Sequence, residues 1–169
     1  MLLLKNTGEN RLTFQTGFGY TRKELQTIKK YEFAISRSKS MDIFTSSFAE
    51  KKPYLINDIN SEDENLSPLS IRFVRELGAL SFICCPIVCN REPIGILAVD
   101  NVKTKRPLIQ SDLRLMMGIA SVIGIGIKNT ELYGAMSQQM KSILQVLAAS
   151  IDARDPYTAG HSEDRKSVV

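Results

Sequence analysis

The stretch SFICCPIVCNREPIGILAVD, residues 81–100, decides the expected fold of this 169-residue chain. A turn-like NREP segment joins two apolar runs, 81–89 and 93–100. Runs of this length without polar alternation predict strands that are covered on both faces, at the centre of a sheet. Because a short turn joins them, the two strands are expected to pair antiparallel. Pro86 cannot donate a hydrogen bond to a sheet ladder, so we expect a bulge or an unbonded position there.

Shorter elements precede this pair of strands. Two strand-like runs flank the turn formers Asn6, Gly8 and Asn10, which predicts a hairpin. Further apolar residues recur at helical spacing before residue 80. The expected strands are 2–5, 11–16, 31–36 and 54–58, and the expected short helices are 41–52 and 70–78. Adjacent strands joined by short turns, with helices packed on them, predict an α+β fold built on an antiparallel sheet.

A long amphipathic helix is expected after the central strands. Ser111 is the predicted N-cap, and Asp112 follows in the first turn, where a negative charge suits the helix dipole. The helix is predicted over 112–132, and a second helical segment over 135–154. Its apolar stripe consists of Leu132, Met136, Met140, Ile143, Leu147 and Ile151. This spacing is close to a coiled-coil seam, and because one isolated helix cannot bury its own stripe, it predicts a helical partner.

Composition excludes several classes of protein. Hydrophobic residues make up 43% of the chain, enough for a packed core. The net charge of +4 is spread in short pairs, and the densest basic spot is KTKR at 103–106. No basic stripe with interleaved aromatic residues is present, so we expect no nucleic-acid partner. The apolar run 115–127 is shorter than a bilayer span, and residues 1–10 do not form a signal peptide, so we expect a cytoplasmic protein without a membrane partner.

The three cysteines, Cys84, Cys85 and Cys89, lie within six residues of one another. An odd, clustered set does not form a disulfide framework. Neighbouring residues on a strand point to opposite faces, and Cys85 and Cys89 lie about 13 Å apart at strand rise, so no pair can chelate a metal. Burial in the core is the plain interpretation, and a thiol redox sensor is the alternative.

At the central strands the sequence resembles the end of a GAF domain. The resemblance rests on SFICCPIVCNREPIGILAVDN (81–101), on PLIQSDLRLMMGIASVIGIGIKNTELY (107–133) and on FAEKKPYLINDIN (48–60). It covers residues 1–133, and the helix with which the family usually opens is expected to be missing. The resemblance implies a sensory module with a small-molecule pocket between the sheet and its covering loops and helices. It also implies homodimerisation through helices and signal output along 134–152.

Candidate residues for these roles follow from the resemblance and the predicted elements. The expected pocket residues are Phe44, Phe48, Asp58, Phe73, Ser81 and Cys84, and the expected dimer and output residues are Leu132, Met136, Met140, Ile143 and Leu147. The ligand stays unidentified, and no cofactor is required, since nothing marks haem, bilin or nucleotide. Asn101, Lys103 and Asp112 can be aligned with the signature of cyclic-nucleotide-binding members, but Leu108 and Leu113 depart from its Phe and Glu.

The tail resembles the opening of a second family. SIDARDPYTAGHSE, residues 150–163, is similar to the start of an HD-GYP domain, which implies a cyclic di-GMP phosphodiesterase in which His161 matches the first metal ligand. A site of two metals needs several His and Asp ligands, and the chain has one His. We therefore expect no catalytic residue and no complete metal site in this chain. Residues 153–169 are expected to be the truncated start of the enzyme domain of a longer sensor–phosphodiesterase. A sensory module is the favoured function, and the alternatives are that phosphodiesterase, if the chain continues, and a thiol redox sensor.

Overall fold

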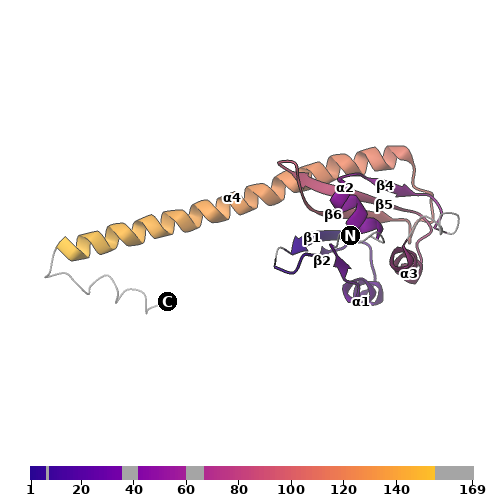
Figure 1. Ribbon diagram of the computed structural model, residues 1–169, viewed down its shortest axis with the longest axis horizontal. Helices are drawn as coiled ribbons and strands as arrows, with labels where there is room; N and C mark the ends of the chain where they lie inside the picture. The colour runs from indigo at the N-terminus through magenta and orange to yellow at the C-terminus, as the bar shows by residue number, and fades with distance from the viewer. Residues whose placement is uncertain (7, 36–41, 60–66, 155–169) are drawn as a thin grey trace. The chain divides into compact units, whose positions relative to one another are not determined.

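A computed structural model of the protein describes residues 1–6, 8–35, 42–59 and 67–154 (Figure 1). The strands are β1 (Leu2–Asn6), β2 (Arg11–Thr16), β3 (Phe33–Ala34), β4 (Tyr54–Ile56), β5 (Phe82–Cys89) and β6 (Glu92–Asp100). The helices are α1 (Arg22–Lys30), α2 (Ile43–Glu50), α3 (Pro68–Leu77) and α4 (Gln110–Arg154). The chain divides into two compact units, Met1–Gly126 and Ile127–Val169.

The strands form one antiparallel sheet in the order β3-β2-β1-β6-β5-β4, which confirms the α+β prediction. The expected hairpin is the pair β1–β2, and the two apolar runs pair as β5–β6 from Phe82 opposite Asp100 to Cys89 opposite Glu92. Pro86 lies within this ladder opposite Ile96, and the irregularity follows one residue later, between Ile87 and Val88.

Both faces of the sheet are covered (Figure 1). On one face, α1, α2 and α3 contribute Ile28, Phe44 and Phe73 to the larger apolar cluster. On the opposite face, the first part of α4 packs Leu113 and Ala120 on the sheet. The strand β5 serves both clusters: Phe82 and Cys84 belong to the first, and Ile83, Cys85 and Ile87 belong to the second. The two-sided apolar pattern of this strand is therefore explained by its central place.

Local capping explains where the helices begin. Thr21 forms a capping box with Glu24 at the start of α1, a helix that sequence reasoning missed. Asp42 accepts hydrogen bonds from the first amides of α2, and Ser67 does the same for α3. α4 begins at Gln110, so the predicted N-cap Ser111 lies inside its first turn.

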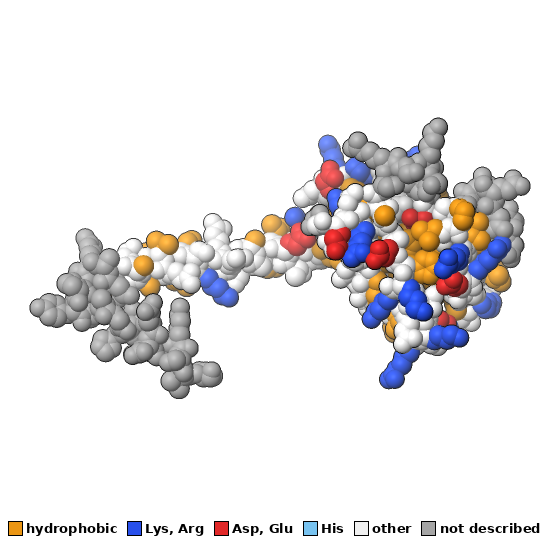
Figure 2. Space-filling model, turned by 60° about the horizontal axis from the view of Figure 1, so that its bottom comes forward, with side chains coloured by type: hydrophobic (Ala, Val, Ile, Leu, Met, Phe, Trp, Pro, Cys, Tyr) orange, Lys and Arg blue, Asp and Glu red, His pale blue; other side chains and the backbone are white. Residues whose placement is uncertain are grey.

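The two helical segments expected after residue 110 are one helix of 45 residues. By length and composition alone, α4 from Gln110 to Ile151 could cross a membrane, although each apolar run in it is short. Residues 131–151 are all exposed. Figure 2 shows hydrophobic side chains along α4 with few charged ones between them.

Candidate ligand site

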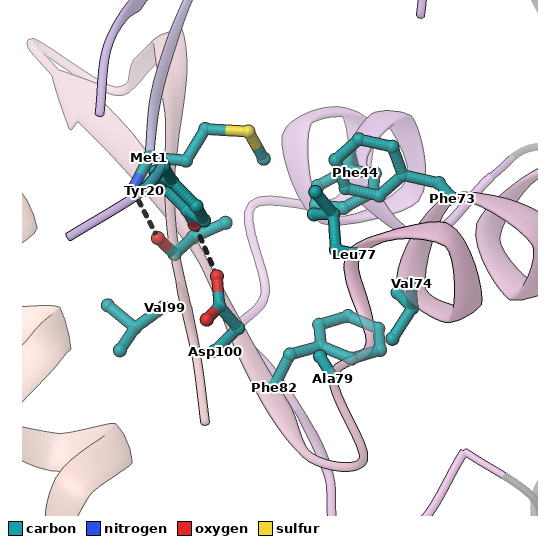
Figure 3. A pocket seen from close by; sticks show the side chains of 11 residues that line it. Met1, Tyr20, Phe44, Phe73, Val74, Leu77, Ala79, Phe82, Val99 and Asp100 are labelled. Atoms are coloured by element: carbon teal, nitrogen blue, oxygen red, sulfur yellow. Dashed lines mark hydrogen bonds between the residues drawn. The ribbon is translucent and has the colours of Figure 1, made fainter. Parts of the chain in front are cut away.

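A small cavity lies between the sheet and the helices α2 and α3. Its free volume is about 20 Å³, room for roughly one water molecule. Its walls are mainly apolar (Figure 3), and they are formed by Met1, Tyr20, Phe44, Phe73, Val74, Leu77, Ala79, Phe82, Ala98, Val99 and Asp100. The strands β5 and β6 supply one wall, and α2 and α3 supply the wall that faces them.

Aromatic rings define the inner end of this cavity. The ring centroid of Phe44 lies 4.7 Å from that of Phe33, 5.3 Å from that of Phe73 and 6.1 Å from that of Phe82. The contact with Phe73 is edge-to-face, an arrangement that aromatic pairs prefer. Asp42 fixes the start of α2, because its Oδ1 accepts hydrogen bonds from the amides of Phe44 (2.9 Å) and Thr45 (3.1 Å). The N-cap of α2 thus fixes the helix that places Phe44 at the apolar end of the cavity.

A polar pair stands at the other side of the cavity (Figure 3). The Tyr20 hydroxyl donates a hydrogen bond to Oδ2 of Asp100, and the amide of Val102 donates to Oδ1 of the same carboxylate at 3.1 Å. Burial, and then the charge of Asp100, raise the pKa of the Tyr20 hydroxyl. The nitrogen of Met1 donates to the carbonyl oxygen of Ala98 at 2.8 Å. The site therefore combines apolar walls with one carboxylate–phenol pair.

The structure separates the residues predicted to line a pocket. Phe44 and Phe73 line the cavity. Phe48 and Cys84 are buried in the same apolar cluster but are not part of the cavity wall. Ser81 is buried, and its hydroxyl donates to the carbonyl oxygen of Ile56 at 2.9 Å, whereas Asp58 is exposed. Sequence reasoning did not single out Tyr20 and Asp100, which come from segments 80 residues apart.

Asn101 has a structural position next to this site. It is 2% exposed, and its Oδ1 accepts hydrogen bonds from the amides of Leu80 (3.1 Å) and Ser81 (3.0 Å). Its Nδ2 donates to the carbonyl oxygen of Arg106 at 3.1 Å. The Arg106 guanidinium in turn pairs with Asp112 at 2.8 Å. Two of the residues alignable with the cyclic-nucleotide signature, Asn101 and Asp112, therefore hold the loop between β6 and α4.

Two of the three cysteines, Cys84 and Cys85, are buried, whereas Cys89 is partly exposed. Burial raises the pKa of the Cys84 thiol well above its ordinary value and raises the pKa of the Cys85 thiol to about 11. Since the thiolate is the reactive form, burial disfavours reaction of both thiols at neutral pH. Within the described ranges, no group of three or more His, Cys, Asp or Glu side chains could hold a metal ion. The predicted metal ligand His161 lies outside the described residues.

Comparisons with known proteins agree on one fold. Residues 16–127 match the family profile of the GAF domain. No curated protein matches the chain. A methyl-accepting chemotaxis protein (residues 122 to 287) is 24% identical with a TM-score of 0.57, and the match covers 78% of each chain.

Two further solved structures are similar. A domain of a putative two-component sensor histidine kinase protein from Sinorhizobium meliloti is 16% identical with a TM-score of 0.59, covering 81% of this chain and 82% of that one. The GAF domain/HD domain protein from Geobacter sulfurreducens is 14% identical with a TM-score of 0.62, covering 78% of this chain and 80% of that one. These likenesses show the fold.

Proposed function

Because this chain belongs to the GAF domain family, whose members are small-molecule-binding sensory modules of signalling proteins, we propose that it binds a small, largely apolar ligand in the cavity beside Phe44 and Phe73. The observation that carries the proposal is the cavity itself, apolar on most sides and closed by the Tyr20–Asp100 pair. Its free volume of about 20 Å³ is smaller than a drug-like ligand, so binding requires the cavity to expand.

Benzene is a suitable first probe because apolar cavities in proteins take it up. We expect saturable shifts of the Phe44 and Phe73 ring signals in nuclear magnetic resonance spectra of the full chain. Ala98→Val adds volume to the cavity wall and should abolish these shifts. The matched control is Ala34→Val, because Ala34 is exposed on β3. Equal shifts in the Ala98→Val and Ala34→Val variants, or no saturable shift in the original protein, would rule out ligand uptake by this cavity.

The route from the cavity to α4 passes through β5. Phe82 forms part of the cavity wall, while the next residue, Ile83, belongs to the cluster under α4. The fit between β5 and α4 is close, because a Cβ atom on Gly124 would lie 3.1 Å from the carbonyl oxygen of Val88. Expansion of the cavity that displaces β5 must therefore also displace the helix that packs on its other face. This is the coupling that a sensory output requires.

We propose that the second part of α4 pairs with the same helix of a second copy. Of the predicted dimer residues, Met136, Met140, Ile143 and Leu147 are spaced by four, three and four; Tyr133, three residues before Met136, extends this coiled-coil repeat better than the predicted Leu132. All five residues of the repeat are exposed. Between residues 127 and 151 the charged residues are Lys128, Glu131 and Lys141, and at 3.6 residues per turn they lie away from this seam. A second copy presents the same repeat in register and would bury both seams.

Leu147→Asp tests this pairing, since it places a charge in the seam. Light scattering should show a dimer for the original chain and a monomer for the variant. Gln138→Asp is the control, because Gln138 lies on the opposite side of the helix. An unchanged mass for Leu147→Asp would end the helix-pairing hypothesis. Flotation with phosphatidylcholine vesicles checks the other possible occupant, a lipid bilayer, which the length and composition of α4 allow.

An enzymatic function has a separate test. The segment 150–163 resembles the opening of an HD-GYP domain, and we propose that the module regulates such a phosphodiesterase domain where the two share one polypeptide. This chain, with one His in total, should show no hydrolysis of cyclic di-GMP with added manganese or iron. Metal-dependent turnover that disappears in His161→Ala would make the chain an enzyme instead.

A further inference from the structure

KTKR, residues 103–106, is the densest basic spot of the sequence. In the structure, two of its three cationic side chains have hydrogen-bond partners. The Arg106 guanidinium donates to both carboxylate oxygens of Asp112, at 2.8 and 2.9 Å. The Lys105 ammonium donates to the carbonyl oxygen of Gly78 at 2.7 Å. The ammonium of Lys103 has no hydrogen bond or ion pair with any residue that the structure describes. Only Lys103 therefore keeps all its donors for a ligand.

Lys103 lies at a hollow of about 140 Å³ on the surface of the first compact unit. The loop after β2 contributes Phe18, Gly19 and Tyr20, and the end of β6 with the loop after it contributes Asp100, Lys103 and Thr104. A volume of this size is close to that of engineered protein cavities that hold a benzene molecule. The hollow can thus accommodate one aromatic ring.

Phe18 lies at the edge of the hollow, on a loop whose backbone is fixed beyond it by the start of α1. The Phe18 side chain is 99% exposed, so its ring is free to contact a ligand. The next residue, Gly19, has φ of 87°, a conformation that glycine adopts without steric cost. Two residues later, Thr21 fixes the loop to α1, because its amide donates to Oε2 of Glu24 at 2.6 Å. The loop therefore presents an uncovered aromatic ring from a capped helix start.

The uncommitted hydrogen-bond donors of the hollow belong to Lys103, whereas its carboxylate, Asp100, already has partners. Each oxygen of the Asp100 carboxylate already accepts a hydrogen bond, one from the Tyr20 hydroxyl and one from the Val102 amide. The Glu24 carboxylate, outside the lining, is engaged by the capping box, and the nearby charge of Lys103 contributes to lowering its pKa. Lys103 makes no hydrogen bond there, so its donors stay available to a ligand. We propose that this hollow, which shares Tyr20 and Asp100 with the cavity between the sheet and α2 and α3, is a second binding site, for a small aromatic acid. The ring of the acid contacts Phe18, and its carboxylate pairs with the Lys103 ammonium.

Three probes that share one ring and differ in charge test this site. Indole-3-acetate is an anion, 3-methylindole is neutral and tryptamine is a cation. Titrations of the full chain, followed by the amide signals of Gly19 and Thr104, should give the tightest binding for indole-3-acetate. Lys103→Met should weaken indole-3-acetate by a factor of about two to five, as expected for an exposed ion pair, and leave 3-methylindole unchanged. Phe18→Ala should weaken all three probes, since each shares the indole ring.

The matched control is Lys105→Met, because Lys105 is two residues away and bonded to Gly78. It should leave the affinity for indole-3-acetate unchanged. Tighter binding of tryptamine, absence of shifts at the hollow, or equal effects of Lys103→Met and Lys105→Met would each overturn the proposal. Ala98 lines the cavity beside Phe44 and not the hollow. Titrating the Ala98→Val variant with indole-3-acetate therefore tests the hollow separately from benzene binding in that cavity.

Discussion

Asn101→Ala should destabilise the protein far more than its position in a loop indicates. The side chain is 2% exposed and joins three segments: the turn after α3, the start of β5 and the loop before α4. Alanine removes the Oδ1 acceptor for the amides of Leu80 and Ser81, and it removes the Nδ2 donor to the carbonyl oxygen of Arg106.

The magnitude follows from which of these partners water can reach. A buried donor left without an acceptor costs about 1–3 kcal/mol, and this applies to the amide of Ser81, whose bond to Asn101 is buried. The other two bonds are only partly buried, so their loss costs about 0.5–1.5 kcal/mol each. Together the three bonds give an expected total loss of roughly 2–6 kcal/mol.

Urea unfolding followed by circular dichroism measures this loss. The midpoint should fall while the slope of free energy against urea stays the same, because the surface exposed on unfolding is unchanged. Asn129→Ala is the control: Asn129 is exposed on α4, and its replacement should change stability by less than about 0.5 kcal/mol. A loss below about 1 kcal/mol for Asn101→Ala would mean that these hydrogen bonds do not hold the loop.

Three other changes probe the sheet, the polar pair and the thiols. Gly95→Ala should lower the free energy of unfolding, measured with urea, by at least about 2 kcal/mol, because a Cβ atom there would overlap the carbonyl oxygen of Leu3 across the β1–β6 pair. The pKa of the Tyr20 hydroxyl is raised in the folded state by burial and by a neighbouring carboxylate. Stability should therefore fall as pH rises above about 10, the pKa of an unfolded tyrosine, where only the unfolded state readily loses the proton. Between pH 8 and pH 10.5 the Tyr20→Phe variant should lose less stability than the original protein. An equal loss of stability in both proteins would contradict the effect. Cys84 and Cys85 should resist a disulfide reagent at pH 8 until urea is added, since burial keeps both thiols protonated; rapid labelling of either residue in the folded protein would revive a redox function.

The strongly apolar central strands were predictable, and a mainly polar helix was not. The pair β5–β6 was recognisable in the sequence because it is apolar on both faces, and it is apolar because both faces are covered. Helix α1 is mainly polar and has one buried residue, Ile28, so it contains few apolar positions from which to read a helical spacing. Its capping box, Thr21 followed by Glu24, was the available sequence signal. A search for caps as well as for periodicity would have found this helix.

The candidate site was predictable only in its apolar part. Phe44 and Phe73 were found because aromatic residues on helices that cover a sheet belong to its core. Tyr20 and Asp100 are 80 residues apart, and only the sheet order, with β1 beside β6, brings the two segments together. No local sequence pattern indicates that these two segments are neighbours in the fold. The same reason applies to Lys103, which looks like any solvated lysine until its neighbours are seen to have partners.

The position of β5 also limits how the protein can respond to a ligand. The strand is apolar on both faces because it forms part of the cavity wall through Phe82 and supports α4 through Ile83 and Ile87. Packed interiors tolerate little change in volume, so a ligand that enlarges a cavity of about 20 Å³ must move some of its walls. If the wall formed by α2 and α3 moves, the change stays on that side of the sheet. If β5 moves, the turns of α4 around Gly124 must move with it, because Gly124 packs closely against the carbonyl group of Val88 on β5. Comparing benzene-induced shifts at Ile87 and Gly124 with those at Val74 therefore distinguishes a module that only binds from one that transmits.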